Sequence, residues 1–314
     1  MVKIAGIDIG GTKISGAVIE NGKIISDIIK EETPFDTNKI LEKIFNIIET
    51  LKANYELQSI AIATAGAVNN ENSKVIGSTG NLPSDYPTIE FKKVFEEKFN
   101  LPTLIENDAN AAAFAEYKVG AAKNSQISIT ATLGTGVGGG IIINGKILKG
   151  KSGAAGEIGH IMLGITKERS CTCGEYNCFE AYASGTGFRR TIQELAGKTP
   201  EFKTSILKDK KINELTTYDV IDGYKNNDEF CKIAYETWEN ELIIGLTSLA
   251  NVFDPDNIVI SGGLAGEVNY EKIQNIINQK IVTTPIKLLK AQAGNFAGMI
   301  GAALLAQEKF FDNN

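Results

Sequence analysis

Two stretches decide the fold: IAGIDIGGTKISGAVIENGKIIS (residues 4–26) and ISITATLGTGVGGGIIINGKILK (residues 127–149). They align without a gap, and nine of the 23 positions are identical, including the whole Asn-Gly-Lys-Ile segment. Each reads as strand, glycine-threonine turn, strand, Asn-Gly turn and strand, because both residues of an Asn-Gly turn accept positive φ. Unrelated β-meanders with similar turns could look alike, but a gapless match across two turns favours an internal duplication.

Helical and strand-like segments alternate after each repeat. Residues 37–52, 88–99 and 109–120 have the pattern of helices, while residues 59–68, 101–108 and 257–266 contain short apolar strands. Strands alternating with helices indicate α/β layers. The sequence therefore predicts two similar α/β domains with a cleft between them.

Composition and charge exclude several classes of protein. A chain of 314 residues with 43% hydrophobic and 22% charged residues is typical of a soluble globular protein of two domains. Its formal charge of −6 argues against a nucleic-acid binder. The first residues lack the apolar run of a signal peptide, and no stretch reaches the ~20 apolar residues of a membrane helix. We therefore expect a cytoplasmic protein without a membrane partner.

Three glycine turns follow predicted strands, at residues 8–13, 133–140 and 260–266. Glycine lets backbone N–H groups approach a phosphate without a Cβ in the way, although one such turn alone is also ordinary hairpin chemistry. The spacing of a Walker A loop is absent. Asp8 aligns with Ala131 of the second repeat, and a single carboxylate at a phosphate turn suits a hydrated Mg²⁺ ion. The alternative for Asp8 is a turn-stabilising role.

One twenty-residue stretch, residues 159–178, holds the only histidine and three of the four cysteines. Three thiolates and one imidazole form a closed tetrahedral set, as in structural Zn²⁺ sites. These candidate ligands are His160, Cys171, Cys173 and Cys178. The alternative is a reduced cysteine loop without metal, whereas Cys231 reads as a small buried residue of a helix.

Together these motifs resemble those of the ROK family of sugar kinases, within the actin, Hsp70 and hexokinase superfamily. DIGGTK is similar to the first phosphate motif, LGTGVGGG to the second and VISGG to the adenosine motif. GEIGH followed by CTCGEYNCFE resembles the family signature and zinc site, with Asn177 where the family usually has glycine. The resemblance implies a duplicated two-domain actin-like (ribonuclease H-like) α/β fold, which we expect to divide into residues 1–118 plus 298–314 and residues 119–297.

The resemblance also implies ligands and residues. It implies ATP, Mg²⁺, structural Zn²⁺ and a sugar, and analogy suggests a homodimer. The implied ATP-binding residues are Asp8, Gly10, Gly11, Thr12, Lys13, Gly134, Thr135, Gly136, Gly262 and Gly263. The implied sugar-binding residues are Gly66, Asn81, Asn107, Asp108, Glu157, His160 and Glu180. For Glu157 and Glu180 the alternative is a solvated loop charge.

Asp108 is the expected general base, which accepts the proton of the sugar hydroxyl. From the residues alone, Asp108 could equally cap the helix that follows it. The only histidine stands among metal ligands, which leaves a carboxylate as the base. We expect phosphorylation of glucose to glucose 6-phosphate. The alternatives are fructose, N-acetylglucosamine and N-acetylmannosamine as acceptors, or a non-catalytic sugar-sensing regulator. Some ROK relatives are repressors with an added N-terminal DNA-binding domain, for which we expect no room before the first hairpin.

Overall fold

The computed structural model describes residues 1–77 and 82–312, so Asn81, a predicted sugar ligand, lies outside the described residues. The chain forms two compact units, residues 1–130, 139–156 and 291–314, and residues 131–138 and 157–290. This division differs from the domain limits expected above. Phe114 packs with Ile142, and Glu116 accepts hydrogen bonds from the backbone N–H groups of Gln292 and Ala293. These contacts join the second hairpin and the segment after residue 290 to the first unit. The expected limits stay a prediction.

The sheet of the first unit has the order β3-β2-β1-β5-β8, with β4 paired to β2. Strands β1, β2 and β3 pair antiparallel, whereas β1, β5 and β8 pair parallel. The carboxyl ends of the parallel strands therefore meet at one edge of this sheet. The strands are β1 (Lys3–Ile9), β2 (Lys13–Glu20), β3 (Lys23–Ile24), β4 (Ile29–Glu32), β5 (Ser59–Thr64) and β8 (Thr103–Asn107), beside a hairpin of β6 (Ala67–Val68) and β7 (Val75–Gly77).

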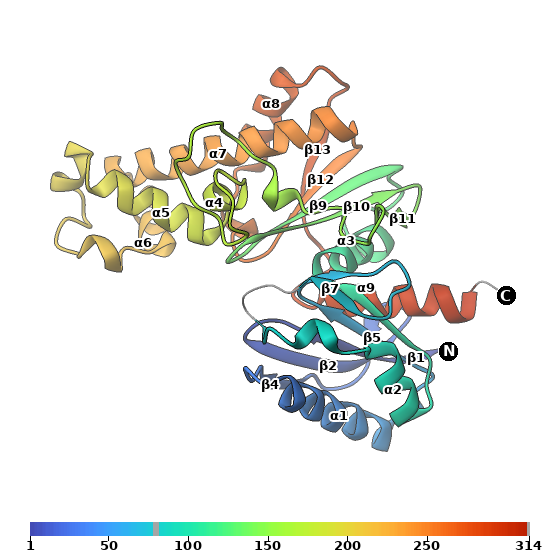
Figure 1. Cartoon of the computed structure of the whole chain (residues 1–314). Coiled ribbons are helices and arrows are strands. Elements are labelled where there is room, and N and C mark those ends of the chain that lie inside the picture. Colours follow the sequence, from blue (N-terminus) through green and yellow to red (C-terminus); the bar gives the residue numbers. More distant parts are fainter. Residues whose placement is uncertain (78–81, 313–314) are drawn as a thin grey trace. The chain divides into compact units, whose positions relative to one another are not determined.

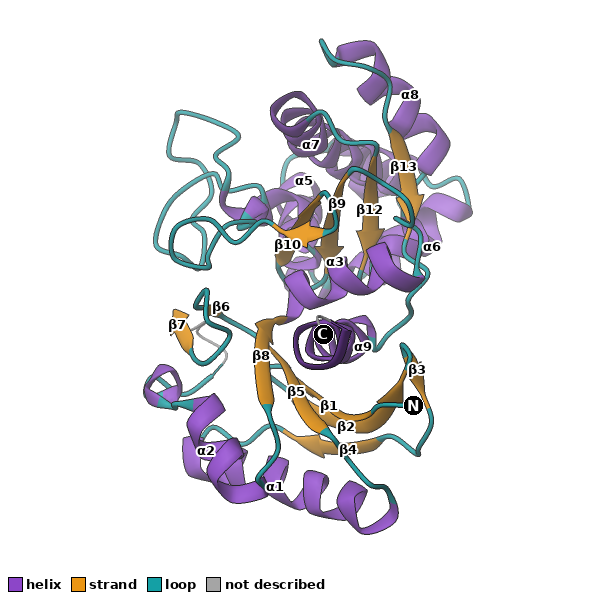
Figure 2. Cartoon of the chain, turned by 90° about the vertical axis from the view of Figure 1, so that its right-hand side faces the viewer, coloured by secondary structure: helices purple, strands orange, loops and turns teal. Residues whose placement is uncertain are grey.

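Helices cover both faces of this sheet (Figure 2). Helices α1 (Thr37–Asn54) and α2 (Phe91–Phe99) bury an apolar stripe of isoleucine, leucine and phenylalanine on one face. Helices α3 (Asp108–Val119) and α9 (Ala297–Gln307) pack on the other through an alanine-rich core. A Cβ on Gly301 of α9 would lie 1.7 Å from the carbonyl oxygen of Ala111 of α3. Small residues thus allow the two helices to touch, and the helices predicted over 37–52, 88–99 and 109–120 are confirmed.

The second sheet has the order β11-β10-β9-β12-β13. Its strands are β9 (Ile127–Leu133), β10 (Val137–Ile143), β11 (Lys146–Ile147), β12 (Asn257–Ser261) and β13 (Lys287–Lys290). The helices of the second unit are α4 (Glu180–Ala183), α5 (Gly185–Ala196), α6 (Thr217–Lys225), α7 (Glu229–Phe253) and α8 (Tyr270–Lys280), several of which are labelled in Figure 1. Short 3₁₀ turns lie at Tyr86–Thr88, Ile158–His160, Pro200–Thr204, Ile212–Glu214 and Ala265–Glu267, and a π-helical turn at Glu308–Asp312.

The duplicated hairpins agree with the sequence at their second turn. Asn21 and Gly22 have φ of 49° and 74°, and Asn144 and Gly145 have φ of 50° and 79°. The first turn differs, because the burial pattern of β1 recurs in β9 only when Asp8 is matched with Thr132. The second glycine turn also closes one residue earlier, because the Gly10 N–H donates to the Lys13 carbonyl whereas the Gly134 N–H donates to the Gly136 carbonyl. The gapless alignment of Asp8 with Ala131 was therefore wrong.

Among residues 1–77 and 82–312, no helix combines the length and apolar character needed to cross a membrane.

Candidate functional site: glycine turns, paired carboxylates and a Cys/His cluster

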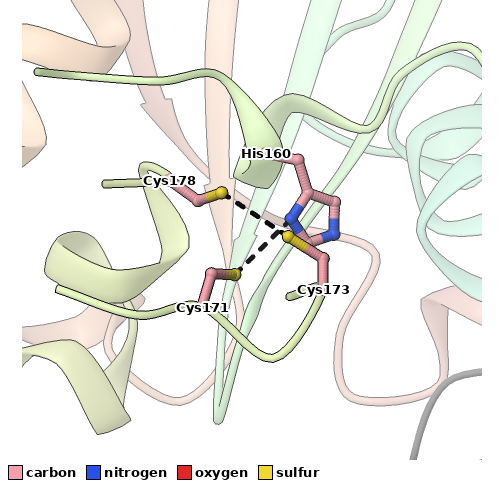
Figure 3. A group of neighbouring side chains, drawn as sticks. All are labelled: His160, Cys171, Cys173 and Cys178. Atoms are coloured by element: carbon pink, nitrogen blue, oxygen red, sulfur yellow. Dashed lines mark hydrogen bonds between the residues drawn. The ribbon is translucent and has the colours of Figure 1, made fainter. Parts of the chain in front are cut away.

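The Cys/His cluster comes together as predicted (Figure 3). The ligand atoms of His160, Cys171, Cys173 and Cys178 all lie within 4.8 Å of one another. The Cys173 and Cys178 sulfurs are 3.7 Å apart, and the Cys171 sulfur lies 3.7 Å from His160 Nδ1. With metal bonds of about 2.3 Å to sulfur and about 2.0–2.1 Å to nitrogen, tetrahedral zinc places neighbouring ligands about 3.6–3.8 Å apart. The donor set therefore fits Zn²⁺, and these two separations match those of a tetrahedral zinc site.

Asn177 organises the loop that carries these ligands. Its φ of 58° lies in the left-handed region, where asparagine is better tolerated than most residues. Its side-chain oxygen accepts hydrogen bonds from the backbone N–H of Glu168 (3.2 Å) and Arg169 (3.0 Å) and from the Tyr182 hydroxyl (2.8 Å). Its side-chain nitrogen donates to the Thr166 carbonyl. Asn177 thus both adopts the left-handed backbone conformation and crosslinks the loop.

Arg169 joins this loop to two helices. Its guanidinium is buried, 2.9 Å from the carboxylate of Glu194 in α5 and 3.6 Å from that of Glu241 in α7, and it lies over the ring of Tyr182. Burial raises the pKa of Glu241 to about 7 despite the nearby guanidinium. Burial also acts to raise the pKa of Glu194, but the hydrogen bonds and positive charges of Arg169 and Arg190 together outweigh it, and the pKa falls. The loop is therefore anchored by a buried charge.

Glu180, one of the predicted sugar ligands, bridges the Cys/His loop and the second glycine turn. Its Oε2 atom accepts a hydrogen bond from the Val137 backbone N–H at 2.9 Å. Its Oε1 atom accepts one from the Thr172 hydroxyl at 3.0 Å and lies 3.6 Å from the Cys171 sulfur. Glu157 is half exposed, with Oε2 at 3.9 Å from His160 Nε2. The two ring nitrogens of His160 thus face different partners, the cysteine sulfur and a carboxylate.

The glycine turn at residues 134–136 keeps one side open. Nothing lies within 4 Å of a Cβ built on Gly134, whereas one on Gly136 would lie 2.3 Å from Glu180 Oε2. The Gly134 carbonyl accepts a hydrogen bond from the Gly185 backbone N–H, and the Thr135 carbonyl accepts one from the Thr186 hydroxyl. The carbonyls are therefore fixed by the start of α5.

The other two glycine turns lie at the ends of β1 and β12. In the first, which holds Gly11, Thr12 and Lys13, the Gly10 N–H donates to the Lys13 carbonyl. In the third, Gly262 has φ of 87° and its Cβ would meet the Leu133 carbonyl at 2.5 Å, while Gly263 is open. The structure thus places every predicted phosphate turn at a strand end.

Asn107 ends β8 and Asp108 follows it, at the edge of the sheet where Asp8 is the next-to-last residue of β1. Asn107, not Asp108, caps α3, because its Oδ1 atom accepts a hydrogen bond from the Asn110 N–H at 3.0 Å. Its Nδ2 atom donates to the carbonyl of Gly66, whose φ of 96° requires glycine. Burial, and then the charge of Asp108, raise the pKa of Asp8 to about 7. A bound divalent cation would relieve the repulsion between the carboxylates of Asp8 and Asp108. Carboxylate oxygens are also donors that Mg²⁺ prefers.

Two groups at these sites were missed by sequence reasoning. Glu106 is fully buried and lies 2.7 Å from Lys149 Nζ, and its Oε1 atom accepts a hydrogen bond from the Asn107 N–H. A glutamate near the end of an apolar strand was the one sequence feature that could have predicted this buried ion pair. Thr172, which holds Glu180, lay between two cysteines, and no sequence signal pointed to it.

Comparison with known proteins identifies the family. The sequence profile of the ROK family matches residues 4–309. A glucokinase of Streptomyces coelicolor is 36% identical over 317 residues, covering 96% of this chain and 97% of that protein. A ROK family glucokinase of Streptomyces griseus, solved in complex with glucose and AMPPNP, has a TM-score of 0.81 and 31% identity, covering 98% of this chain and 99% of that one. A xylose repressor of Bacillus spizizenii is 31% identical, covering 98% of this chain and 77% of the repressor. The two-domain α/β fold expected from the resemblance is confirmed by these likenesses. This chain belongs to the ROK family.

Proposed function

We propose that this protein is an ATP-dependent sugar kinase that phosphorylates glucose to glucose 6-phosphate. The observation that carries the proposal is the pair of carboxylates at the end of the parallel strands, where the charge of Asp108 helps to raise the pKa of Asp8. In open α/β sheets, ligands bind beyond the carboxyl ends of the strands. The glucokinase of S. coelicolor and the S. griseus complex with glucose and AMPPNP support the choice of acceptor and donor.

Asp108 is the proposed general base. Asn107 caps α3 and places Asp108 in its first turn, so the helix dipole favours the ionised carboxylate. The carboxylate accepts a hydrogen bond from the sugar hydroxyl and takes its proton as the new oxygen–phosphorus bond forms and the bond to the ADP oxygen breaks. Phosphoryl transfer depends mainly on positioning and charge stabilisation, so a weak base is sufficient.

The glycine turns are the proposed phosphate cradle. Backbone N–H groups of Gly10, Gly11, Thr12, Gly134, Thr135 and Gly136 would hold the phosphates, with Lys13 adding positive charge and Gly262 and Gly263 beside the adenosine. Asp8 would hold a hydrated Mg²⁺ ion, which when bound neutralises phosphate charge. The Cys/His cluster would hold one Zn²⁺ ion, which fixes the loop between Glu157 and Glu180.

Asn107, Asp108, Glu157, His160 and Glu180 are proposed to bind the sugar hydroxyls, with Gly66 giving close passage of the chain and Asn81 as a further ligand. Carboxylates and amides recognise hydroxyl groups through paired hydrogen bonds. Fructose, N-acetylglucosamine and N-acetylmannosamine are the alternative acceptors. A homodimer remains our prediction for the assembly.

A coupled assay of ADP release tests the proposal. Mg·ATP is supplied with a panel of hexoses and amino sugars, and we expect the largest kcat/KM with glucose. Asp108→Asn should abolish turnover while glucose binding persists, and Asp27→Asn, an exposed carboxylate of the same unit, should have no effect. Turnover close to that of the unmodified protein in Asp108→Asn would remove Asp108 as the base. No turnover with any sugar, combined with retained sugar binding, would instead favour the sugar-sensing regulator, a role that the similarity to a xylose repressor brings into consideration.

A further inference from the structure

Glu180 accepts hydrogen bonds from two parts of the second unit, one proposed to bind sugar and the other proposed to bind phosphate. One part is the Cys/His loop, residues 160–178, and the other is the glycine turn at residues 134–136. The hydrogen bonds run in series, from the Thr172 hydroxyl to Glu180 Oε1 (3.0 Å) and from the Val137 N–H to Glu180 Oε2 (2.9 Å). One carboxylate therefore connects the loop that ends in a sugar ligand with the turn that would hold phosphate.

The fit between Glu180 and the glycine turn is tight. A Cβ on Gly136 would lie 2.3 Å from Glu180 Oε2, so the turn has no side chain where the carboxylate enters. Two further contacts of the turn come from the start of α5, where the Gly185 N–H and the Thr186 hydroxyl donate hydrogen bonds to the carbonyls of Gly134 and Thr135. Among the described residues, Glu180 binds the N–H group of Val137, the first residue of β10. A movement of the Glu180 carboxylate would therefore displace the start of β10.

We propose that Thr172, Glu180 and the Val137 N–H form a relay through which sugar binding raises the affinity of the glycine turn for nucleotide. The inference rests on the proposed function, since it requires sugar at Glu180 and nucleotide at residues 134–136. Thr172 is a positioning residue, because it acts on the ligands through Glu180. A sugar hydroxyl bound to Glu180 fixes the carboxylate in the orientation that Thr172 already favours. The Val137 N–H then holds the turn in one conformation, which lowers the entropy lost when phosphate binds.

The test measures coupling between two ligands. The dissociation constant of AMPPNP is determined by calorimetry without glucose and with saturating glucose, and the ratio of the two values is the coupling factor. Thr172→Val removes the hydroxyl and keeps the shape of the side chain. We expect the coupling factor to fall roughly two- to tenfold, the range that one hydrogen bond supplies. The affinity for AMPPNP without glucose and the metal content should stay unchanged.

Two variants serve as controls. Thr166→Val makes the same substitution in the same exposed loop, where the hydroxyl donates to Glu168 at 2.6 Å instead of to Glu180. It should leave the coupling factor unchanged. Thr172→Ser keeps the hydroxyl and should retain most of the coupling. A coupling factor in Thr172→Val equal to that of the unmodified protein, with metal retained, would overturn the relay.

A second measurement covers the case in which Thr172→Val loses its metal or its fold. Amide hydrogen exchange at Val137 in the unmodified protein should slow when glucose is added without nucleotide, and Thr166→Val should behave in the same way. Exchange at Val137 that ignores glucose would overturn the relay. Absence of glucose and AMPPNP binding in the unmodified protein would overturn the proposed function together with the relay, whereas binding of both with unchanged coupling would overturn the relay alone.

Discussion

Replacing Asp8 by asparagine should stabilise the protein in the absence of Mg²⁺, and increasingly so as the pH rises. Burial, and then the charge of Asp108, raise the pKa of Asp8 from 3.8 to about 7. The folded protein therefore keeps a proton on Asp8 between pH 4 and pH 7, a range in which the unfolded chain has released it. Stability is lost as the pH rises through this window, and asparagine avoids the loss.

The size of the effect follows from the same two values. One pKa unit corresponds to about 1.4 kcal/mol, so the raised pKa of Asp8 lowers the free energy of unfolding by about 4 kcal/mol above pH 7, where the group is ionised. At pH 5, where the folded protein holds the proton, the loss is only about 1.5 kcal/mol. The gain in free energy of unfolding for Asp8→Asn should therefore grow by about 2–3 kcal/mol between pH 5 and pH 8.

Urea unfolding at both pH values, in Mg²⁺-free buffer of constant ionic strength, measures this gain. Asp27→Asn, at an exposed position, controls for the change in net charge and should show no dependence on pH. Added Mg²⁺ should stabilise the unmodified protein more than Asp8→Asn, because an ion that binds the folded state alone adds to its stability. An equal gain at pH 5 and pH 8 would refute both the shifted pKa and its assignment to burial.

Three further predictions concern packing and metal. Gly301→Ala should destabilise the protein by about 3 kcal/mol or more in urea unfolding, because its Cβ would overlap the Ala111 carbonyl; Gly298→Ala in the same helix, whose Cβ meets only ordinary contacts from 3.5 Å, should cost clearly less, and equal losses would contradict this packing. Arg169→Met should cost about 3–5 kcal/mol, since it leaves Glu241 without its buried partner; stability within 1 kcal/mol of the unmodified protein would argue against the anchor. Elemental analysis should find about one zinc per chain, and its removal by chelation should lower both the melting temperature and kcat/KM; a chelated protein with unchanged values would rule out a structural metal.

The sequence predicted the hairpins well because their turns depend on local chemistry. Asn21-Gly22 and Asn144-Gly145 both adopt the positive φ that this dipeptide favours. The length of the first turn was not predictable in the same way. Glycine and threonine recur in both copies, so a loop shorter by one residue still aligns without a gap. Only the burial of β1 and β9 reveals that Thr132, and not Ala131, stands at the position of Asp8.

The cap of α3 was open from the sequence because both Asn107 and Asp108 are good capping residues. The strand decides between them. β8 continues to Asn107, whose extended backbone lets its side chain turn back to the Asn110 N–H. Asp108 then becomes the first helical residue. This assignment depends on how far β5 and β8 pair, with Thr64 opposite Asn107, which is information that lies outside the segment itself.

Asn177 orders the Cys/His loop through hydrogen bonds that do not involve the four candidate metal ligands. Glycine at this position could adopt the same φ, but it would leave the N–H groups of Glu168 and Arg169 without the side-chain oxygen that accepts them. Those two N–H groups lie just before Cys171, and the Tyr182 hydroxyl that joins them belongs to the helix that begins at Glu180. The asparagine therefore ties the middle of the loop to α4, the helix of Glu180, through hydrogen bonds that involve no metal ligand. Because Asn177 already fixes residues 168 and 169, a bound Zn²⁺ ion would be needed chiefly to fix the residues between 170 and 176, where Thr172 reaches Glu180.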